Sequence, residues 1–179
     1  MDLILKTERL TLRPLQLPDA EAMFVLDSNP NVHLYLGNNP VKTVSECDDI
    51  IKNIQNQYVQ NGIGRFAVVI TETNESIGWA GLKFITKPEN NHADFYDIGY
   101  RLQEQHWRKG YALEAAFAWR DHAFQVMNIP VIYASAHIEN TGSNAILQKI
   151  GMEYISEFLY EDLPCNWYQL QNPNAKTHL

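Results

Sequence analysis

The chain has 179 residues, a formal net charge of −7 and a hydrophobic fraction of 45%. A chain of this length and composition can bury one sizeable core and is most simply a single domain over residues 1–179. The acidic balance makes nucleic acid a poor partner, and the apolar run at residues 66–70 is far shorter than the ~20 residues that span a bilayer. The N-terminus lacks the basic start and long apolar stretch of a signal peptide, so we expect a cytoplasmic protein without membrane contact.

The first half of the chain predicts one strand and two helices. Residues 10–15 read as a strand, and Pro18-Asp19 suits a helix start with proline in the first turn. Thr43 and Glu46 have the capping-box spacing, and apolar residues follow at helical intervals until Asn61-Gly62. A second helix is therefore expected between these two signals.

The second half predicts strands followed by alternating helices and strands. Residues 66–70, 76–84 and 93–102 read as three strands, and a long apolar helix follows from Gly110 to about Met127. A strand over residues 131–136, a helix over 141–150 ended by Gly151, and two closing strands complete the chain. This order indicates an α+β (mixed α/β) fold with a largely antiparallel sheet.

The cysteines and histidines carry no chemistry of their own in this sequence. Cys47 falls in a predicted helix and Cys165 in a predicted loop, and neither has an obvious His or Asp partner, which favours small apolar side chains over a disulfide or a nucleophile. The six histidines show no metal-ligand spacing. No metal site is therefore expected.

The turn before Gly110 is the most informative segment for function. The apolar strand of Ile98, Tyr100 and Leu102 runs through a polar turn to Gly110, where the long helix begins. Amides of a first helical turn lack intrahelical partners and lie at the positive end of the helix dipole, so they favour an anion. Arg108 and Lys109 add two cations, and the pattern predicts a diphosphate site, although a glycine chosen only for turn geometry fits equally well. Neither G-x-G-x-x-G nor G-x-x-x-x-G-K-[ST] is present, which disfavours a nucleotide-binding protein.

The segment Trp-Arg-Lys-Gly-Tyr-Ala-Leu-Glu-Ala, which follows Asp-Ile-Gly-Tyr-Arg-Leu, resembles the acyl-CoA-binding signature of the GNAT superfamily of N-acetyltransferases. The pattern [Q/R]-x-x-G-x-[G/A] falls on Trp107, Gly110 and Ala112. Trp107 departs from Gln or Arg, but Trp is usual there in the branch that resembles ribosomal-protein N-terminal (alanine/serine) acetyltransferases. Residues 7–15, 140–152 and 167–170 resemble further elements of that branch in the same order.

The resemblance implies a GNAT-like fold and acetyl-CoA as the co-substrate. Such a fold has a twisted sheet of about six or seven strands, flanked by about four helices. The strands at residues 93–102 and 131–136 would splay apart and hold the pantetheine arm between them. The backbone would pair with pantetheine at Ile98, Gly99 and Tyr100, with a bulge at Gly99 as one explanation of that glycine. The pyrophosphate would lie on amides of Arg108, Lys109, Gly110, Tyr111 and Ala112, and Asn140 would bind the pantetheine amides unless it is simply a helix N-cap.

The implied reaction is direct attack of a primary amine on the thioester in a ternary complex, without a metal. For the general base we expect Asp97, because histone-type members carry a Glu there; a carboxylate that only marks a strand start, or a substrate-ammonium anchor, is the alternative. Glu104 and His137 are the next candidates. Many members use a Tyr as the acid, but Gln148 occupies that position here and cannot donate as an acid. Ser143 is the substitute, unless it only satisfies backbone amides of the first helical turn.

The acceptor amine is the least determined part of this interpretation. A protein N-terminus, such as that of a ribosomal protein, and a small amine are both compatible, and a non-catalytic acyl-CoA-binding regulatory module is the alternative function. Residues 19–62 and 155–166 are expected to line the acceptor pocket. Their acidic residues favour a cationic acceptor, although a solvated acidic surface explains them equally well. A homodimer is common in the branch.

Overall fold

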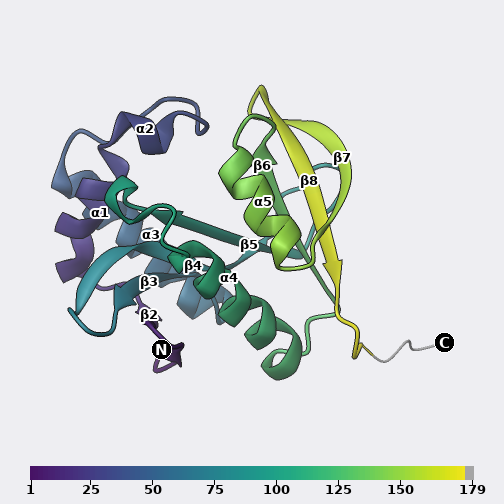
Figure 1. Cartoon of the computed structure of the whole chain (residues 1–179), viewed down its shortest axis with the longest axis horizontal. Coiled ribbons are helices and arrows are strands. Elements are labelled where there is room, and N and C mark those ends of the chain that lie inside the picture. The colour runs from purple at the N-terminus through teal and green to yellow at the C-terminus, as the bar shows by residue number, and fades with distance from the viewer. Residues whose placement is uncertain (176–179) are drawn as a thin grey trace.

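The computed structural model describes residues 1–175, which form one eight-stranded sheet with five α-helices around it (Figure 1). The strand order is β1-β2-β3-β4-β5-β6-β8-β7. The strands are β1 (Leu5–Lys6), β2 (Leu10–Pro14), β3 (Arg65–Ile70), β4 (Glu75–Ile85), β5 (Phe95–Leu102), β6 (Val131–His137), β7 (Glu153–Tyr160) and β8 (Leu163–Gln171). The helices are α1 (Ala20–Asp27), α2 (Pro30–His33), α3 (Val44–Asn61), α4 (Tyr111–Asp121) and α5 (Thr141–Lys149), with short 3-10 turns η1 (Leu17–Asp19) and η2 (Glu104–His106) and a π-helical extension η3 (His122–Val126) of α4.

The expected α+β class is confirmed, with one strand and one helix more than the sequence predicts. Every strand pairing is antiparallel except that of β5 with β6. The additional elements are β1, of two residues, and α2, of four residues. Elements this short carry no hydrophobic period, so the sequence pattern could not reveal them. Cys165, expected in a loop, lies in β8.

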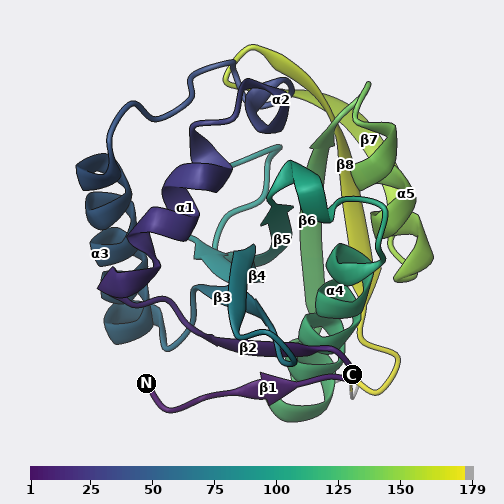
Figure 2. The ribbon, with the colours of Figure 1, turned by 60° about the vertical axis from the view of Figure 1, so that its left-hand side comes forward.

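The sheet separates two apolar layers (Figure 2). One face packs against α4 and α5, and its core includes Phe66, Leu82, Ile98, Trp119 and Leu147. The other face packs against α1 and α3, with a core that includes Leu15, Met23, Ile51 and Val69. Because side chains alternate between the faces of a strand, neighbouring residues of β3, such as Phe66 and Ala67, contribute to different layers. No helix within residues 1–175 is long and apolar enough to cross a membrane.

Strands β5 and β6 separate shortly after they meet. Their parallel pairing joins only Tyr96 to Ile132 and Asp97 to Tyr133. Beyond these pairs β5 keeps β4 as its neighbour and β6 keeps β8, so the two halves of the sheet diverge (Figure 1). The splayed central strands are therefore present as expected.

The predicted capping signals of α3 are also confirmed. Thr43 is the N-cap, and its hydroxyl accepts a hydrogen bond from the Glu46 amide at 3.3 Å. The helix ends at Gly62, which adopts a left-handed conformation with φ 68°. Cys47, Ile51 and Ile54 form its buried face. Local capping chemistry and packing thus agree on both ends of this helix.

Replacing Thr43 by Ala should lower the free energy of unfolding by about 1 kcal/mol, because the Glu46 amide loses its acceptor at the helix N-terminus. Urea unfolding followed by circular dichroism measures the change. Thr86→Ala is the matched control, since Thr86 is an exposed residue outside any helix or strand. Equal stability of the two variants would contradict the capping role.

Candidate functional site

The loop before α4 is an open anion-binding geometry. Gly110 is the N-cap of α4 with φ 84°, and Arg108 also has a positive φ of 60°. Arg108, Lys109 and Gly110 are exposed, and within residues 1–175 their amides donate to no protein acceptor. These amides and the first turn of α4 lie at the positive end of the helix dipole. The loop can therefore hold an anion through backbone N–H groups, with two cationic side chains beside it.

The free side of β5 leads from this loop to the point where β5 meets β6. Residues 98–102 pair with β4 on one side and with no part of β6 on the other. Alternate N–H and C=O groups of such a strand point toward the free side, where a ligand or water can pair with them. Ile98, Gly99 and Tyr100 all lie on this stretch, as the sequence predicts.

The Tyr100 side chain has a contact that sequence reasoning missed. Its hydroxyl donates to the Ser143 carbonyl oxygen at 2.9 Å and lies 3.2 Å from Ser143 Oγ, which links β5 to α5. Burial raises the pKa of Tyr100, so the phenol stays protonated at neutral pH. The sequence indicated only that Tyr100 shares a strand face with Ile98 and Leu102.

Asn140 and Ser143 lie together at the start of α5. Asn140 is the N-cap, and its Oδ1 accepts a hydrogen bond from the Ser143 amide at 3.0 Å. Its side-chain NH2 group donates to no acceptor within the described residues. Ser143 is half-buried against Tyr100, whereas Gln148 is exposed on a later turn. Ser143, rather than Gln148, therefore faces β5.

Asp97 lies on the opposite face of β5 from Ile98 and is paired with Arg65. The Arg65 Nη2 atom contacts Asp97 Oδ2, and Nη1 donates to the Asp97 carbonyl oxygen at 3.0 Å. The Asp97 side chain is 20% exposed and that of Arg65 is 12% exposed, so the pair is largely shielded from water. Burial raises the pKa of Asp97, and the charges of Arg65 and Lys83 oppose the shift. Arg65 gave no signal in the sequence, because it lies 32 residues away on β3.

Gly99 makes room for Arg65 and does not form the expected bulge. The register of β4 with β5 runs through Gly81 and Gly99 without a shift. A Cβ atom on Gly99 would lie 2.8 Å from Arg65 Nη2. Position 99 is therefore a glycine because a larger side chain would collide with Arg65.

The other two candidate bases hold structural positions. Glu104 accepts hydrogen bonds from the side chains of Asn29 and Asn31 at 2.8 and 3.0 Å, and these bonds lower its pKa. The His137 ring stacks on Tyr35 with centroids 5.2 Å apart, and its Nδ1 accepts from the Glu139 amide at 3.2 Å. Both groups thus connect the α2 segment, residues 29–35, to η2 and to the end of β6.

Two acidic residues and one tyrosine of the segment expected to line the acceptor pocket, residues 19–62, have internal partners instead. Asp19 pairs with Arg13, and Asp27 pairs with Arg101, each at 2.7 Å. The Tyr58 hydroxyl accepts a hydrogen bond from the Leu15 amide and donates one to the Arg65 carbonyl oxygen, and its ring packs against the core. All three side chains stabilise the fold, and the paired Asp19 and Asp27 are not free charges that could attract a cationic acceptor.

Two further carboxylates, Glu89 and Glu161, act electrostatically together with Asp97. Burial raises the pKa of Glu89, with the charges of Asp97 and Glu161 acting in the same direction. Burial also raises the pKa of Tyr160, again with contributions from these carboxylates. Lys83 and Arg65 act in the opposite direction, so three carboxylates face two cations at this place.

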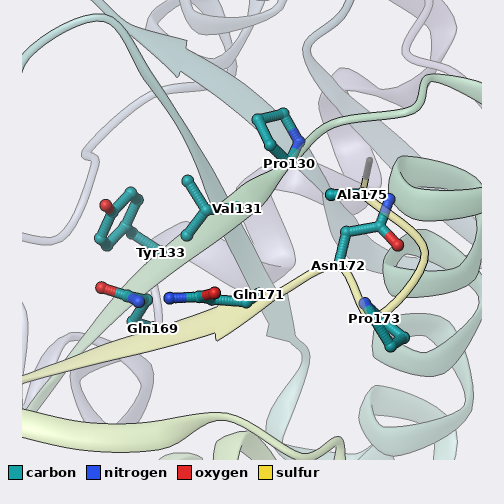
Figure 3. A pocket seen from close by; sticks show the side chains of 8 residues that line it. All are labelled: Pro130, Val131, Tyr133, Gln169, Gln171, Asn172, Pro173 and Ala175. Atoms are coloured by element: carbon teal, nitrogen blue, oxygen red, sulfur yellow. The ribbon is translucent and has the colours of Figure 1, made fainter. Parts of the chain in front are cut away.

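An open groove of about 590 Å³ lies on β6 and β8 (Figure 3). Tyr133, Gln169 and Gln171 line it, together with Pro130, Val131 and Asn172. Tyr133 is the register partner of Asp97, so the groove begins beside the strand position of the predicted base. None of the predicted site residues lines it.

Both cysteines are free and buried, and burial raises the pKa of each thiol, that of Cys47 to about 11. The reactive form of a cysteine is the thiolate, so neither side chain is suited to act as a nucleophile. Within residues 1–175, no group of three or more His, Cys, Asp or Glu side chains is placed to hold a metal ion.

Comparison with known proteins gives the family. Residues 9–153 match the acetyltransferase (GNAT) domain family. The uncharacterized N-acetyltransferase p20 of Bacillus licheniformis is 36% identical over 149 residues, which cover 83% of this chain and 82% of that protein. Spermidine N(1)-acetyltransferase of Escherichia coli K12 is 28% identical, over 84% of this chain and 76% of that protein. A crystal structure of a GNAT-family acetyltransferase from Bacillus anthracis has a TM-score of 0.80 and 25% identity, covering 95% of this chain and 99% of that chain.

The family match spans most of the chain and includes the loop before Gly110 and the start of α5. It confirms the expectation of an enzyme over that of a non-catalytic acyl-CoA-binding module. The chain belongs to the GNAT family of acetyltransferases and is an N-acetyltransferase.

Proposed function

We propose that the enzyme transfers the acetyl group of acetyl-CoA to a primary amine by direct attack in a ternary complex. The observation that carries this proposal is the early separation of β5 from β6. It leaves one edge of β5 unpaired, between the loop before α4 and the polar side chains of Asn140 and Ser143. The loop from Arg108 to Ala112 would bind the diphosphate. Ile98, Gly99, Tyr100 and Asn140 would bind the pantetheine arm.

The two catalytic candidates suit opposite sides of the thioester. Asp97 lies on one face of β5, while Ser143 contacts Tyr100 from the other. A thioester placed along the free side of β5 would present its carbonyl carbon to an amine near Asp97, and its sulfur toward Ser143. Asp97 would take a proton from the ammonium group, so that the free amine bonds to the carbonyl carbon and the C–S bond breaks. Ser143 would donate a proton to the departing thiolate and regain one from solvent. The buried cysteines support direct transfer rather than an acyl-enzyme.

The demand on the base depends on the acceptor. Deprotonating an α-amine with a pKa of ~7.8 costs ~1 kcal/mol at pH 7, whereas a lysine with a pKa of ~10.4 costs ~5 kcal/mol. A carboxylate held by Arg65 is a modest base and suits the first case better. Bringing the reactants together supplies ~7–11 kcal/mol of the barrier in either case.

For the acceptor we propose an amine that carries a second positive charge. The charges of Glu89, Glu161 and Asp97 act on common groups, and those of Glu89 and Glu161 would bind the second positive charge while Asp97 deprotonates the reacting amine. One relative at 28% identity is named for acetylating spermidine, which is such an amine. A thiol-release assay with spermidine, a basic peptide N-terminus and a neutral amine of similar size tests this. A preference for the neutral amine would contradict it.

Gly110→Glu should abolish the binding of acetyl-CoA, for which we expect a dissociation constant in the micromolar range. The new carboxylate would enter the anion site, and its Cβ would lie 3.1 Å from Arg9 Nη2 in a backbone conformation that side chains avoid. Isothermal titration calorimetry measures binding, with ATP and NAD as comparators.

The matched control is Gly62→Glu, which has a similar positive φ at the end of α3 and open space around it. It should lose stability but bind acetyl-CoA normally. Failure of the folded wild-type protein to bind acetyl-CoA would contradict the proposed function.

Asp97→Asn should lower kcat by about 100-fold and remove the acidic limb of its pH profile. A base must be deprotonated, so wild-type kcat should fall as the pH drops through the pKa of Asp97, which lies above the ordinary ~3.9. Initial rates at saturating substrates from pH 5 to 9 measure the effect. Asp49→Asn, on an exposed part of α3, is the control. An unchanged rate and profile would rule out Asp97 as the base.

Ser143→Ala should lower kcat by about tenfold or more and leave the KM for acetyl-CoA nearly unchanged, because the proton donor acts only on the departing thiolate. Steady-state kinetics at varied acetyl-CoA separates the two constants. Thr141→Ala, on the exposed first turn of the same helix, should change neither. An equal loss in binding and turnover would make Ser143 a binding or structural residue.

A further inference from the structure

Glu114 in the first turn of α4 is bound from three directions by the N-terminal segment. Thr7 Oγ1 donates to Glu114 Oε1 at 2.5 Å, and the Arg9 amide donates to the same oxygen at 2.8 Å. Arg9 Nε and Nη2 both approach Glu114 Oε2 at 2.7 Å, which makes a forked contact with one side of the guanidinium. The turn between β1 and β2 is therefore fixed to the start of α4.

The remaining side of the Arg9 guanidinium contacts the loop before α4. Nη1 donates to the Lys109 carbonyl oxygen at 2.9 Å, and the guanidinium lies 4.6 Å from the centre of the Tyr111 ring. All of its nitrogens thus have partners in or beside this loop. A planar guanidinium held at two edges has little freedom to rotate.

The contact with Lys109 sets the direction of the next amide. In a trans peptide the C=O of one residue and the N–H of the next point in opposite directions, and the described chain has no cis peptide. Since the Lys109 C=O points at Arg9, the Gly110 N–H points away from Arg9. Gly110 is exposed, and its amide has no protein acceptor within residues 1–175. Arg9 therefore turns this N–H toward the open side of the loop.

Arg9 also offsets a charge that opposes an anion. Burial alone would raise the pKa of Glu114, but the hydrogen bonds from Thr7 and Arg9 outweigh it and lower the pKa. Glu114 is therefore ionised at neutral pH, one turn from the loop that would hold the diphosphate. Its pairing with Arg9 removes most of the repulsion that a free carboxylate would exert there.

We propose that Arg9 is a positioning residue for the diphosphate of acetyl-CoA: held by Glu114, it grips the Lys109 carbonyl and so aims the Gly110 amide at the phosphate oxygens. This inference rests on the proposed function, in which the loop from Arg108 to Ala112 binds the diphosphate. It gives the N-terminal Thr7 to Arg9 segment a role in co-substrate binding, although it is distant in sequence and lies outside the loop itself.

The test compares acetyl-CoA with acetyl-pantetheine, a thioester that lacks the diphosphate. Arg9→Gln should raise the KM for acetyl-CoA about tenfold, which corresponds to one weakened charge-assisted hydrogen bond, while kcat stays within about twofold. The KM for acetyl-pantetheine should not change. Glu114→Gln should act in the same direction, because it releases the guanidinium. A purely structural defect would affect both thioesters alike.

Arg13→Gln is the matched control, since Arg13 lies on β2, four residues after Arg9, and pairs with Asp19 away from α4. It should leave both KM values unchanged. If Arg9→Gln does not fold, Arg9→Lys keeps the charge but cannot contact Glu114 and Lys109 together, and it should show a smaller rise for acetyl-CoA alone.

Two results would overturn the inference while the proposed function stands: no change in the KM for acetyl-CoA in a folded Arg9 variant, or an equal rise for both thioesters. A wild-type enzyme that binds acetyl-CoA no better than acetyl-pantetheine would also overturn it, because the loop would then contribute nothing to affinity. Failure of the wild-type protein to bind either thioester would contradict the proposed function, and this inference would fall with it.

Discussion

The site depends on one limited contact, the parallel pairing of β5 with β6 through two residue pairs. A longer pairing would satisfy the free side of β5 within the sheet and leave nothing for a ligand. Because the pairing stops at Asp97 and Tyr133, the backbone from Ile98 onward needs partners from outside the sheet. The packing of the eight strands against both helical layers holds the two halves of the sheet together at these two pairs and keeps them apart from Ile98 onward.

The alternation of side chains along β5 then distributes the chemistry. Ile98 and Tyr100 face α4 and α5, and Tyr100 reaches Ser143 there. Asp97 and Gly99 face the other side, where Arg65 holds the carboxylate and occupies the space above the glycine. The proposed base Asp97 and the proposed acid Ser143 therefore lie on opposite sides of one strand, with the proposed thioester along its unpaired edge.

The loop before α4 shows how a local motif relies on distant support. Its glycine and cations are local features of the sequence. The direction of its central amide, however, is set by Arg9, and Arg9 is set by Glu114 and Thr7. In the same way, the α2 segment is tied to Glu104 and His137, which explains why both polar residues resist a simple catalytic interpretation.

The sequence by itself determined the elements whose signals are local. The capping box of α3, its glycine end, the hydrophobic period of the strands and the glycine before α4 all depend on neighbours within a few residues, and each is confirmed. The resemblance of four segments to one family predicted the fold and the enzyme class, and the family match over residues 9–153 confirms both. Only the tertiary structure decided which distant side chains meet: Arg65 with Asp97, Tyr100 with Ser143, and Arg9 with Glu114. These contacts join residues 32 to 105 positions apart, and no periodicity or spacing along the chain encodes such a meeting.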